Sequence, residues 1–293
     1  MPTYDRSSSL DYAFGALAGT ANITAGYPFD SVKVRLQTSV PGRFTGPWHC
    51  LRHIVATEGV VRGLYRGMSA PVIGGALETA VNYGVYRACL RSLQADEQSL
   101  QARDIALAAG SAGFILSFIL SPFELIKCRM QLGVAAGYTS THDCVRRTLQ
   151  QEGLLGLTRG LGGTIARETP GNALFFTVYE KLRQAPQSHW LQQQSPWLQK
   201  TLDLGGVVTA GGCAGMVMWA TVLPIDVAKT RIQTALPGTK YDVGILRSLK
   251  QLYQEGGVRV LYAGLTPTLI RAFPANAAQW LTWDVLLRVS ASV

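Results

Sequence analysis

One short motif occurs three times in the 293-residue chain. It reads Pro-x-(Asp/Glu)-x-x-Lys-x-Arg-x-Gln, and its prolines are Pro28, Pro122 and Pro224, which lie 94 and 102 residues apart. Self-similarity at a nearly constant period is the mark of a repeat architecture. The sequence therefore predicts three consecutive units, with boundaries at 1–97, 98–199 and 200–293.

Each copy of the motif follows a long run without charged residues. The runs cover 12–29, 105–123 and 204–225. At a helical rise of about 1.5 Å per residue, they come close to or match the roughly 30 Å thickness of a bilayer's hydrocarbon core. Because apolar residues keep helical spacing beyond each proline, we expect one helix to continue through a proline kink. An acid and a lysine then lie three residues apart, just beyond each bend.

The composition favours a membrane protein over a soluble one. Charged residues make up 15% of the chain and hydrophobic residues 47%, so few charges remain to cover a soluble surface of this size. The net charge of +9 raises the possibility of a nucleic-acid partner. No basic patch interleaved with aromatic residues is present, however, so anionic lipid headgroups and an anionic solute pathway fit the charge better.

Targeting and cysteine usage also limit the possibilities. Residues 1–9 are polar, and neither a secretory signal nor an Arg-rich transit segment is visible, so we expect internal targeting. The cysteine number is odd and no CxxC pair occurs, which argues against a disulfide framework and favours a thiol-tolerant compartment. The cysteines are Cys50, Cys89, Cys128, Cys144 and Cys213.

The triplicated motif resembles the signature of the mitochondrial carrier family, and the resemblance covers nearly the whole chain. It implies an all-α membrane protein with six transmembrane helices in three pseudosymmetric two-helix repeats, each with a short surface helix. It further implies a monomer in the mitochondrial inner membrane that alternates between two open states.

Each unit also contains an amphipathic segment and a glycine turn. The segments 48–57, 141–151 and 243–255 are too short and too polar to span a bilayer, so we expect them to lie along its surface. The turns end at Gly67, Gly160 and Gly264. A helix beginning there would present free N–H groups to a phosphate, and the family resemblance suggests cardiolipin as a structural lipid. A plain helix start is the alternative.

The motif acids and lysines predict a gate. One arrangement is a ring between units, which pairs Asp30 with Lys127, Glu124 with Lys229, and Asp226 with Lys33. The other is local pairing three residues apart along each helix. Threefold placement near a bundle axis favours the ring, and partly buried pairs of marginal stability suit a gate that opens in every cycle. Gln37, Gln131 and Gln233 resemble the family's glutamine braces, which can donate to these carboxylates.

The family's second gate, at the far ends of the second helices, is incomplete in this sequence. Its pattern is Tyr/Phe-(Asp/Glu)-x-x-(Lys/Arg), and only Tyr179, Glu180 and Arg183 match it fully. The first unit has Tyr86-Arg87 with Leu90, and the third has Trp283-Asp284 with Leu287. A strong salt-bridge ring on that side is therefore in doubt.

Charges that break the threefold repeat point to the solute. Ionisable residues within membrane helices are functional candidates, and the aligned second helices carry Glu78, Arg167, Glu168 and Arg271. Gly74 replaces the arginine in the first unit and would leave room for a ligand. Trp219 adds a large ring that either lines the cavity or faces lipid.

Two arginines can hold a carboxylate, and two glutamates can hold ammonium groups. The pair at Arg167 and Glu168 and the run from Arg271 resemble ornithine and basic amino acid carriers. The sequence thus predicts exchange of ornithine, lysine or arginine, including exchange against citrulline and a proton. Carnitine, acylcarnitine or a methylated basic amino acid is the alternative, with Trp219 offering cation–π attraction.

Two other classes of protein fit the sequence less well. An enzyme is disfavoured because no nucleophile–base set or metal cluster occurs; His49 and His53 lack a third ligand and fit a solvated helix face better than a metal site. A scaffold that no longer transports is disfavoured by the intact gate motifs.

Overall fold

The computed structural model describes residues 8–75, 85, 88–89, 102–133, 136–184 and 196–291. All regular secondary structure in these ranges is helical. Three long helices carry the repeated motif: α1 (Ser8–Thr38), α5 (Ala102–Gln131) and α9 (Pro196–Thr234). Pro28, Pro122 and Pro224 lie inside them, which confirms that each helix continues past its proline.

The remaining helices follow the long ones in a repeated order. Short helices come next along the chain: α2 (Pro47–Glu58), α3 (Val60–Leu64), α6 (Thr141–Gly156) and α10 (Ile245–Leu261). A second long helix then begins in each unit. These are α7 (Leu161–Gln184), α11 (Leu265–Ala291) and, in the first unit, the helical residues 69–75, where that described segment ends.

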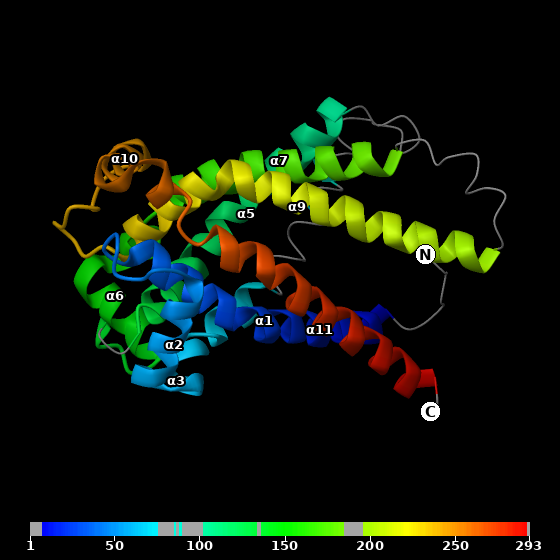
Figure 1. Ribbon diagram of the computed structural model, residues 1–293, viewed down its shortest axis with the longest axis horizontal. Helices are drawn as coiled ribbons and strands as arrows, with labels where there is room; N and C mark the ends of the chain where they lie inside the picture. The colour runs from blue at the N-terminus through cyan, green and yellow to red at the C-terminus, as the bar shows by residue number, and fades with distance from the viewer. Residues whose placement is uncertain are drawn as a thin grey trace.

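The long helices run lengthwise through an elongated bundle (Figure 1). α2, α3, α6 and α10 gather at one end of it, on the left of the view. The start of α1 and the end of α11 lie toward the other end. α1 packs along α11, and α7 packs against both α5 and α9. Helices from different units therefore lie side by side.

Within the described residues, two stretches are long and apolar enough to cross a membrane by length and composition: Arg103–Gln131 and Gly211–Thr234. Both belong to motif helices. α7 has the length of a span, but Arg167 and Glu168 interrupt its apolar character in the first half of the helix. Charges placed there depress the mean hydropathy of the whole helix.

The short helices bury one face against the motif helices. Their buried residues occur four positions apart, as expected for one face of an amphipathic helix. These are Cys50 and Ile54 in α2, Cys144 and Thr148 in α6, and Ser248 and Leu252 in α10. The backbone leaves helical geometry at Gly153 in α6 and at Gly256 and Gly257 in α10, directly after Glu152 and Glu255.

The three glycine turns join neighbouring units. Gly67, Gly160 and Gly264 have φ values of 80°, 83° and 87°, in the left-handed region that favours glycine. A helix begins after each one, as the sequence predicts. A Cβ atom at Gly67 would lie 2.5 Å from Cβ of Met130, and one at Gly160 would lie 2.7 Å from Cγ of Gln233. Each of these turns therefore packs against the motif helix of the next unit.

Candidate functional site

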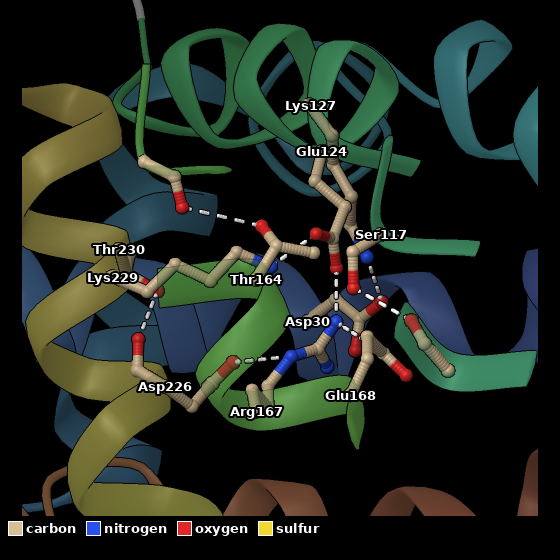
Figure 2. A network of polar contacts seen from close by, with 12 residues as sticks. Asp30, Ser117, Glu124, Lys127, Thr164, Arg167, Glu168, Asp226, Lys229 and Thr230 are labelled. Carbon is tan, nitrogen blue, oxygen red and sulfur yellow. Dashed lines mark hydrogen bonds and ion pairs between the residues drawn. The ribbon is translucent and has the colours of Figure 1, made fainter. Parts of the chain in front are cut away.

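Three ion pairs connect the motif helices in a ring. Nζ of Lys127 on α5 lies 2.5 Å from Oδ2 of Asp30 on α1. Nζ of Lys33 on α1 lies 2.7 Å from Oδ2 of Asp226 on α9, and Lys229 on α9 pairs with Glu124 on α5. Figure 2 shows the acids Asp30, Glu124 and Asp226 together with Lys127 and Lys229. The partners are those expected for a ring between units, and the local i,i+3 alternative is not formed among the described residues.

The ring is largely removed from solvent. Asp30, Asp226 and Lys229 are exposed by only 7%, 5% and 2%. Burying charged groups has a large desolvation penalty, which their mutual attraction roughly offsets when the geometry is good. Removing one partner from such a pair typically costs about 3–5 kcal/mol. The ring is thus marginally stabilising when complete and strongly destabilising when broken on one side.

One of the three expected glutamine braces is present. Nε2 of Gln37 donates to Oδ2 of Asp226 at 3.2 Å, beside the pair with Lys33. Nε2 of Gln131 donates instead to the Ser31 hydroxyl at 3.3 Å. The Gln233 amide has no hydrogen-bond partner among the described residues, and its aliphatic carbons pack against Gly160. The glutamines are therefore not equivalent in this conformation.

Arg167 bridges two acids of the ring. Its Nη2 lies 2.5 Å from Oε1 of Glu124 and also contacts the neighbouring Glu168, while its Nε lies 3.7 Å from Oδ1 of Asp226. Figure 2 shows the side chain entering the ring from α7. A residue that the sequence assigns to solute binding is thus in direct contact with the predicted gate.

Arg271 reaches the ring from the third unit. Its Nε lies 3.2 Å from Oδ1 of Asp30. A Cβ atom at Gly26 would lie only 2.6 Å from this Nε, so the arginine depends on the missing side chain there. Sequence reasoning missed Gly26. The signal was available, because Leu120 and Val222 occupy the equivalent positions two residues before the other motif prolines.

The gate and the predicted solute site form one cluster. Within the described residues it contains the lysines 33, 127 and 229, the arginines 167 and 271, and the carboxylates 30, 124, 168 and 226. Its cations outnumber its carboxylates by one. A solute carboxylate that binds Arg167 or Arg271 must therefore compete with a carboxylate of the ring.

The first unit's contribution differs from the expectation. Gly74 is buried, and a Cβ atom there would lie 3.1 Å from Cβ of Phe123. The space expected beside Gly74 for a ligand is therefore filled by the Phe123 side chain. Glu78, which the sequence places one helical turn further on, lies outside the described residues.

Trp219 lies beside the ring. Nζ of Lys33 is 4.3 Å from the centroid of the indole, within the range of a cation–π interaction. The same ring packs against the buried cluster that contains Leu223 and Val227. Of the two positions expected for Trp219, the inward one is occupied, and a gate lysine covers its face.

The second predicted gate is only partly described. The Tyr179 ring stacks on Phe175 with centroids 6.2 Å apart. No ion pair joins Glu180 to another described residue. The Arg183, Trp283, Asp284 and Leu287 side chains and all of Tyr86, Arg87 and Leu90 lie outside the described part of the chain.

The two histidines that were weighed as metal ligands lie on α2. His49 and His53 lie against the Phe44 ring, at centroid distances of 5.7 and 5.5 Å. No group of three or more His, Cys, Asp or Glu side chains in those ranges is arranged to hold a metal ion.

Two motif arginines form ion pairs with glutamates near the ends of the short helices, and sequence reasoning missed these pairs. Arg35 makes two contacts with the Glu58 carboxylate, and its Nε donates to the Gln131 carbonyl at 2.8 Å. Arg129 pairs with Glu152 and donates to the Gln233 carbonyl in the same way. The available signal was the recurrence of the arginine seven residues after each motif proline and of the acid 30 residues after Pro28 and Pro122.

Comparison with known proteins gives a consistent result. The family model described as "Mitochondrial carrier protein" matches residues 5–97, 99–189 and 200–291. The chain is 39% identical to the mitochondrial arginine transporter BAC1 of Arabidopsis thaliana, over 95% of this chain and 93% of that protein. It is 37% identical to the mitochondrial basic amino acids transporter of Bos taurus, over 95% and 91%. It is 36% identical to the mitochondrial carnitine/acylcarnitine carrier protein of Macaca fascicularis, over 94% and 92%.

Proposed function

Because the chain belongs to the mitochondrial carrier family, we propose that it is an inner-membrane solute carrier that exchanges cationic amino acids. The observation that carries the proposal is the similarity, over 95% of the chain, to relatives named for arginine and for basic amino acids. A cationic α-amino acid also fits the residues of the site. Its carboxylate matches Arg167 or Arg271, and its ammonium groups match Glu168 and Glu78.

In the proposed architecture, six membrane helices form three pseudosymmetric repeats, at 1–97, 98–199 and 200–293. The second helices span the membrane despite their charges, because those charges face the inside of the bundle. Cardiolipin is proposed as a structural lipid at the three glycine turns, where helices begin. The carrier acts as a monomer, since one chain contains all three repeats.

The proposed mechanism links solute binding to gate opening. With the ring closed at the matrix end, a solute enters from the opposite side and meets Arg167 and Arg271. A carboxylate that takes either arginine away from Glu124 or Asp30 leaves the acid with one partner fewer. Because a buried acid that loses a partner is destabilised, binding weakens the ring and favours its opening. The solute then leaves on the matrix side, and the ring closes again.

Carnitine and acylcarnitine remain the second candidate, because a carnitine carrier is 36% identical to this chain. A quaternary ammonium group would bind best on an open aromatic face. The Trp219 face is covered by Lys33 in the closed ring, so it is available only after the gate rearranges. This observation favours ornithine, lysine and arginine over carnitine.

The test is exchange in reconstituted liposomes that contain the full chain. Labelled arginine, lysine, ornithine, citrulline and carnitine are compared as external solutes against internal arginine. We expect rapid uptake of the dibasic amino acids and little uptake of carnitine. Uptake of carnitine alone would contradict the proposal.

Glu78→Gln provides a second readout. Uptake of dibasic amino acids should fall about tenfold or more, because a charge-assisted hydrogen bond contributes about 1.5–3 kcal/mol. Citrulline uptake should change much less.

A further inference from the structure

A cavity of about 230 Å³ lies where the three motif helices end. Thr38 at the end of α1, Leu132 just beyond α5, and Arg231 and Thr234 on α9 line it. Lys240 and Tyr241, in the segment after α9, also line it. All three repeats therefore contribute to one cavity, a few residues beyond the ring of ion pairs.

The arginine in this cavity breaks the threefold pattern of the motif arginines. Nη2 of Arg35 lies 2.6 Å from Glu58, and Nη2 of Arg129 lies 2.6 Å from Glu152. The corresponding acid of the third unit, Glu255, pairs with Lys240 at 2.5 Å. No carboxylate within the described residues forms an ion pair with Arg231. In the third unit the acid therefore pairs with a lysine, and the motif arginine has no carboxylate partner among the described residues.

Arg231 retains unused donors. A guanidinium has five N–H donors, and the Arg231 group donates from Nη2 to the Ser39 carbonyl at 2.6 Å. Its Nε is buried without a hydrogen-bond partner among the described residues. The guanidinium carbon lies 5.3 Å from the Tyr241 ring centroid, and Nζ of Lys240 lies 5.7 Å from the same centroid. Two cations therefore flank one aromatic ring at the cavity wall.

The charges around the cavity favour an anion. Arg231 and Lys240 bring two positive charges and Glu255 brings one negative charge, so one positive charge is uncompensated. Arginine and lysine donors together suit the oxygen atoms of phosphate and carboxylate groups. The Thr38 and Thr234 hydroxyls in the wall already donate to the Val34 and Thr230 carbonyls, so Arg231 and Lys240 are the donors for an anion. A cavity of about 230 Å³ is large enough for such a group together with water.

We propose that this cavity is a regulatory binding site for a small oxyanion, a phosphate or carboxylate group held between Arg231 and Lys240. The site is separate from the solute site and lies on the matrix side of the ring. Because its wall is built from the ends of α1, α5 and α9, it exists only while these ends are together. A bound anion therefore stabilises the conformation in which the ring is closed, and it slows exchange.

The first experiment measures thermal unfolding of the purified full chain with inorganic phosphate, against chloride at equal ionic strength. We expect a saturable rise in Tm of about 3 °C or more at phosphate concentrations well above Kd. The rise in Tm should disappear in Lys240→Gln and become smaller in Arg231→Lys. The Lys240 side chain is 57% exposed, so its position should tolerate the substitution. Lys250→Gln is the matched control: it removes an exposed lysine of α10 that does not line the cavity, and it should keep the rise.

A second experiment identifies the source of the anion and tests the regulatory effect. Arginine exchange is measured in phosphatidylcholine vesicles without added anion, then with phosphate, acetate or cardiolipin. If phosphate or acetate inhibits exchange by the native protein but not by Lys240→Gln, the ligand is a free anion. If cardiolipin inhibits the native protein but not Lys240→Gln, the ligand is a lipid phosphate. No anion effect in either experiment, or equal effects in Lys240→Gln and Lys250→Gln, would overturn the site. Exchange without added anion tests the proposed function separately.

Discussion

At the scale of single residues, the arginines of the site contact the ring and are also the proposed solute ligands. Arg167 contacts Glu124 and Asp226, and Arg271 contacts Asp30, so both stabilise the closed ring. The same guanidinium groups are the proposed partners of a solute carboxylate. A lysine in their place would also be positively charged, but it lacks the planar guanidinium whose several N–H donors allow one group to bridge two carboxylates. The identity of these residues therefore matters for both steps.

Arg271→Ala should abolish most exchange of every α-amino acid. Placing a solute carboxylate in the cavity without its arginine partner costs about 3–5 kcal/mol, so we expect initial exchange rates to fall about 100-fold or more. Arg62→Ala, which removes an exposed arginine of α3, is the control and should exchange normally. Exchange is measured with labelled arginine and with citrulline. Equal rates in Arg271→Ala and the native protein would exclude Arg271 from the solute site.

At the scale of elements, the short helices depend on small residues that face the motif helices. Cys50, Cys144 and Ser248 are each fully buried at equivalent positions. The Cys50 thiol lies 4.0 Å from the Val32 carbonyl, and the Ser248 hydroxyl lies 3.5 Å from the equivalent Ala228 carbonyl. Close contact of this kind leaves no space for a larger side chain. It fixes how the short helices dock on the motif helices.

The two thiols provide a test of this docking. Burial raises the pKa of Cys50 and of Cys144 to about 11. Because the thiolate is the reactive form, and it forms only as the pH approaches that pKa, both thiols should resist N-ethylmaleimide at pH 7–8. We expect mass spectrometry to find them unmodified in the native protein and fully modified after denaturation in SDS. Rapid native labelling of both at pH 7 would show that α2 and α6 are not docked in this way.

At the scale of the whole molecule, several kinds of contact lead from the motif helix of one repeat to the next repeat. The acid–lysine pairs, the arginine contacts to backbone carbonyls and the glycine turns all join neighbouring repeats. Separating the motif helices at this end therefore breaks several kinds of contact together. Because these contacts break together, we expect two discrete conformations rather than a continuous movement.

Charge reversal across two repeats tests the ring. Asp30→Lys should abolish exchange, because it places like charges beside Lys127 and Arg271. Adding Lys127→Asp restores one opposite-charge pair and should recover part of the activity, although the new acid lies further from Arg271. Lys250→Asp, a reversal at an exposed position, should leave exchange unchanged. If the single and double variants are equally inactive while both are folded, the pair between repeats does not operate in transport.

The sequence by itself determined the features that repeat along the chain. Prolines within apolar runs, the spacing of acid and lysine, and glycine turns ahead of helices are local patterns, so they predicted α1, α5, α9 and the starts of α7 and α11. The ring partners were expected from the threefold placement of acid and lysine together with the resemblance to the mitochondrial carrier family; the motif alone also allowed local pairing along each helix. Glu78 remains a prediction from the sequence alone.

Only the tertiary structure decided the contacts that depend on distances between repeats. It placed Arg271 on Asp30 through the space at Gly26, filled the space at Gly74 with Phe123, and covered Trp219 with Lys33. It also paired Glu255 with Lys240 rather than with Arg231. No local pattern encodes these choices, because each depends on which side chains meet when separate helices pack and on how much volume each one occupies.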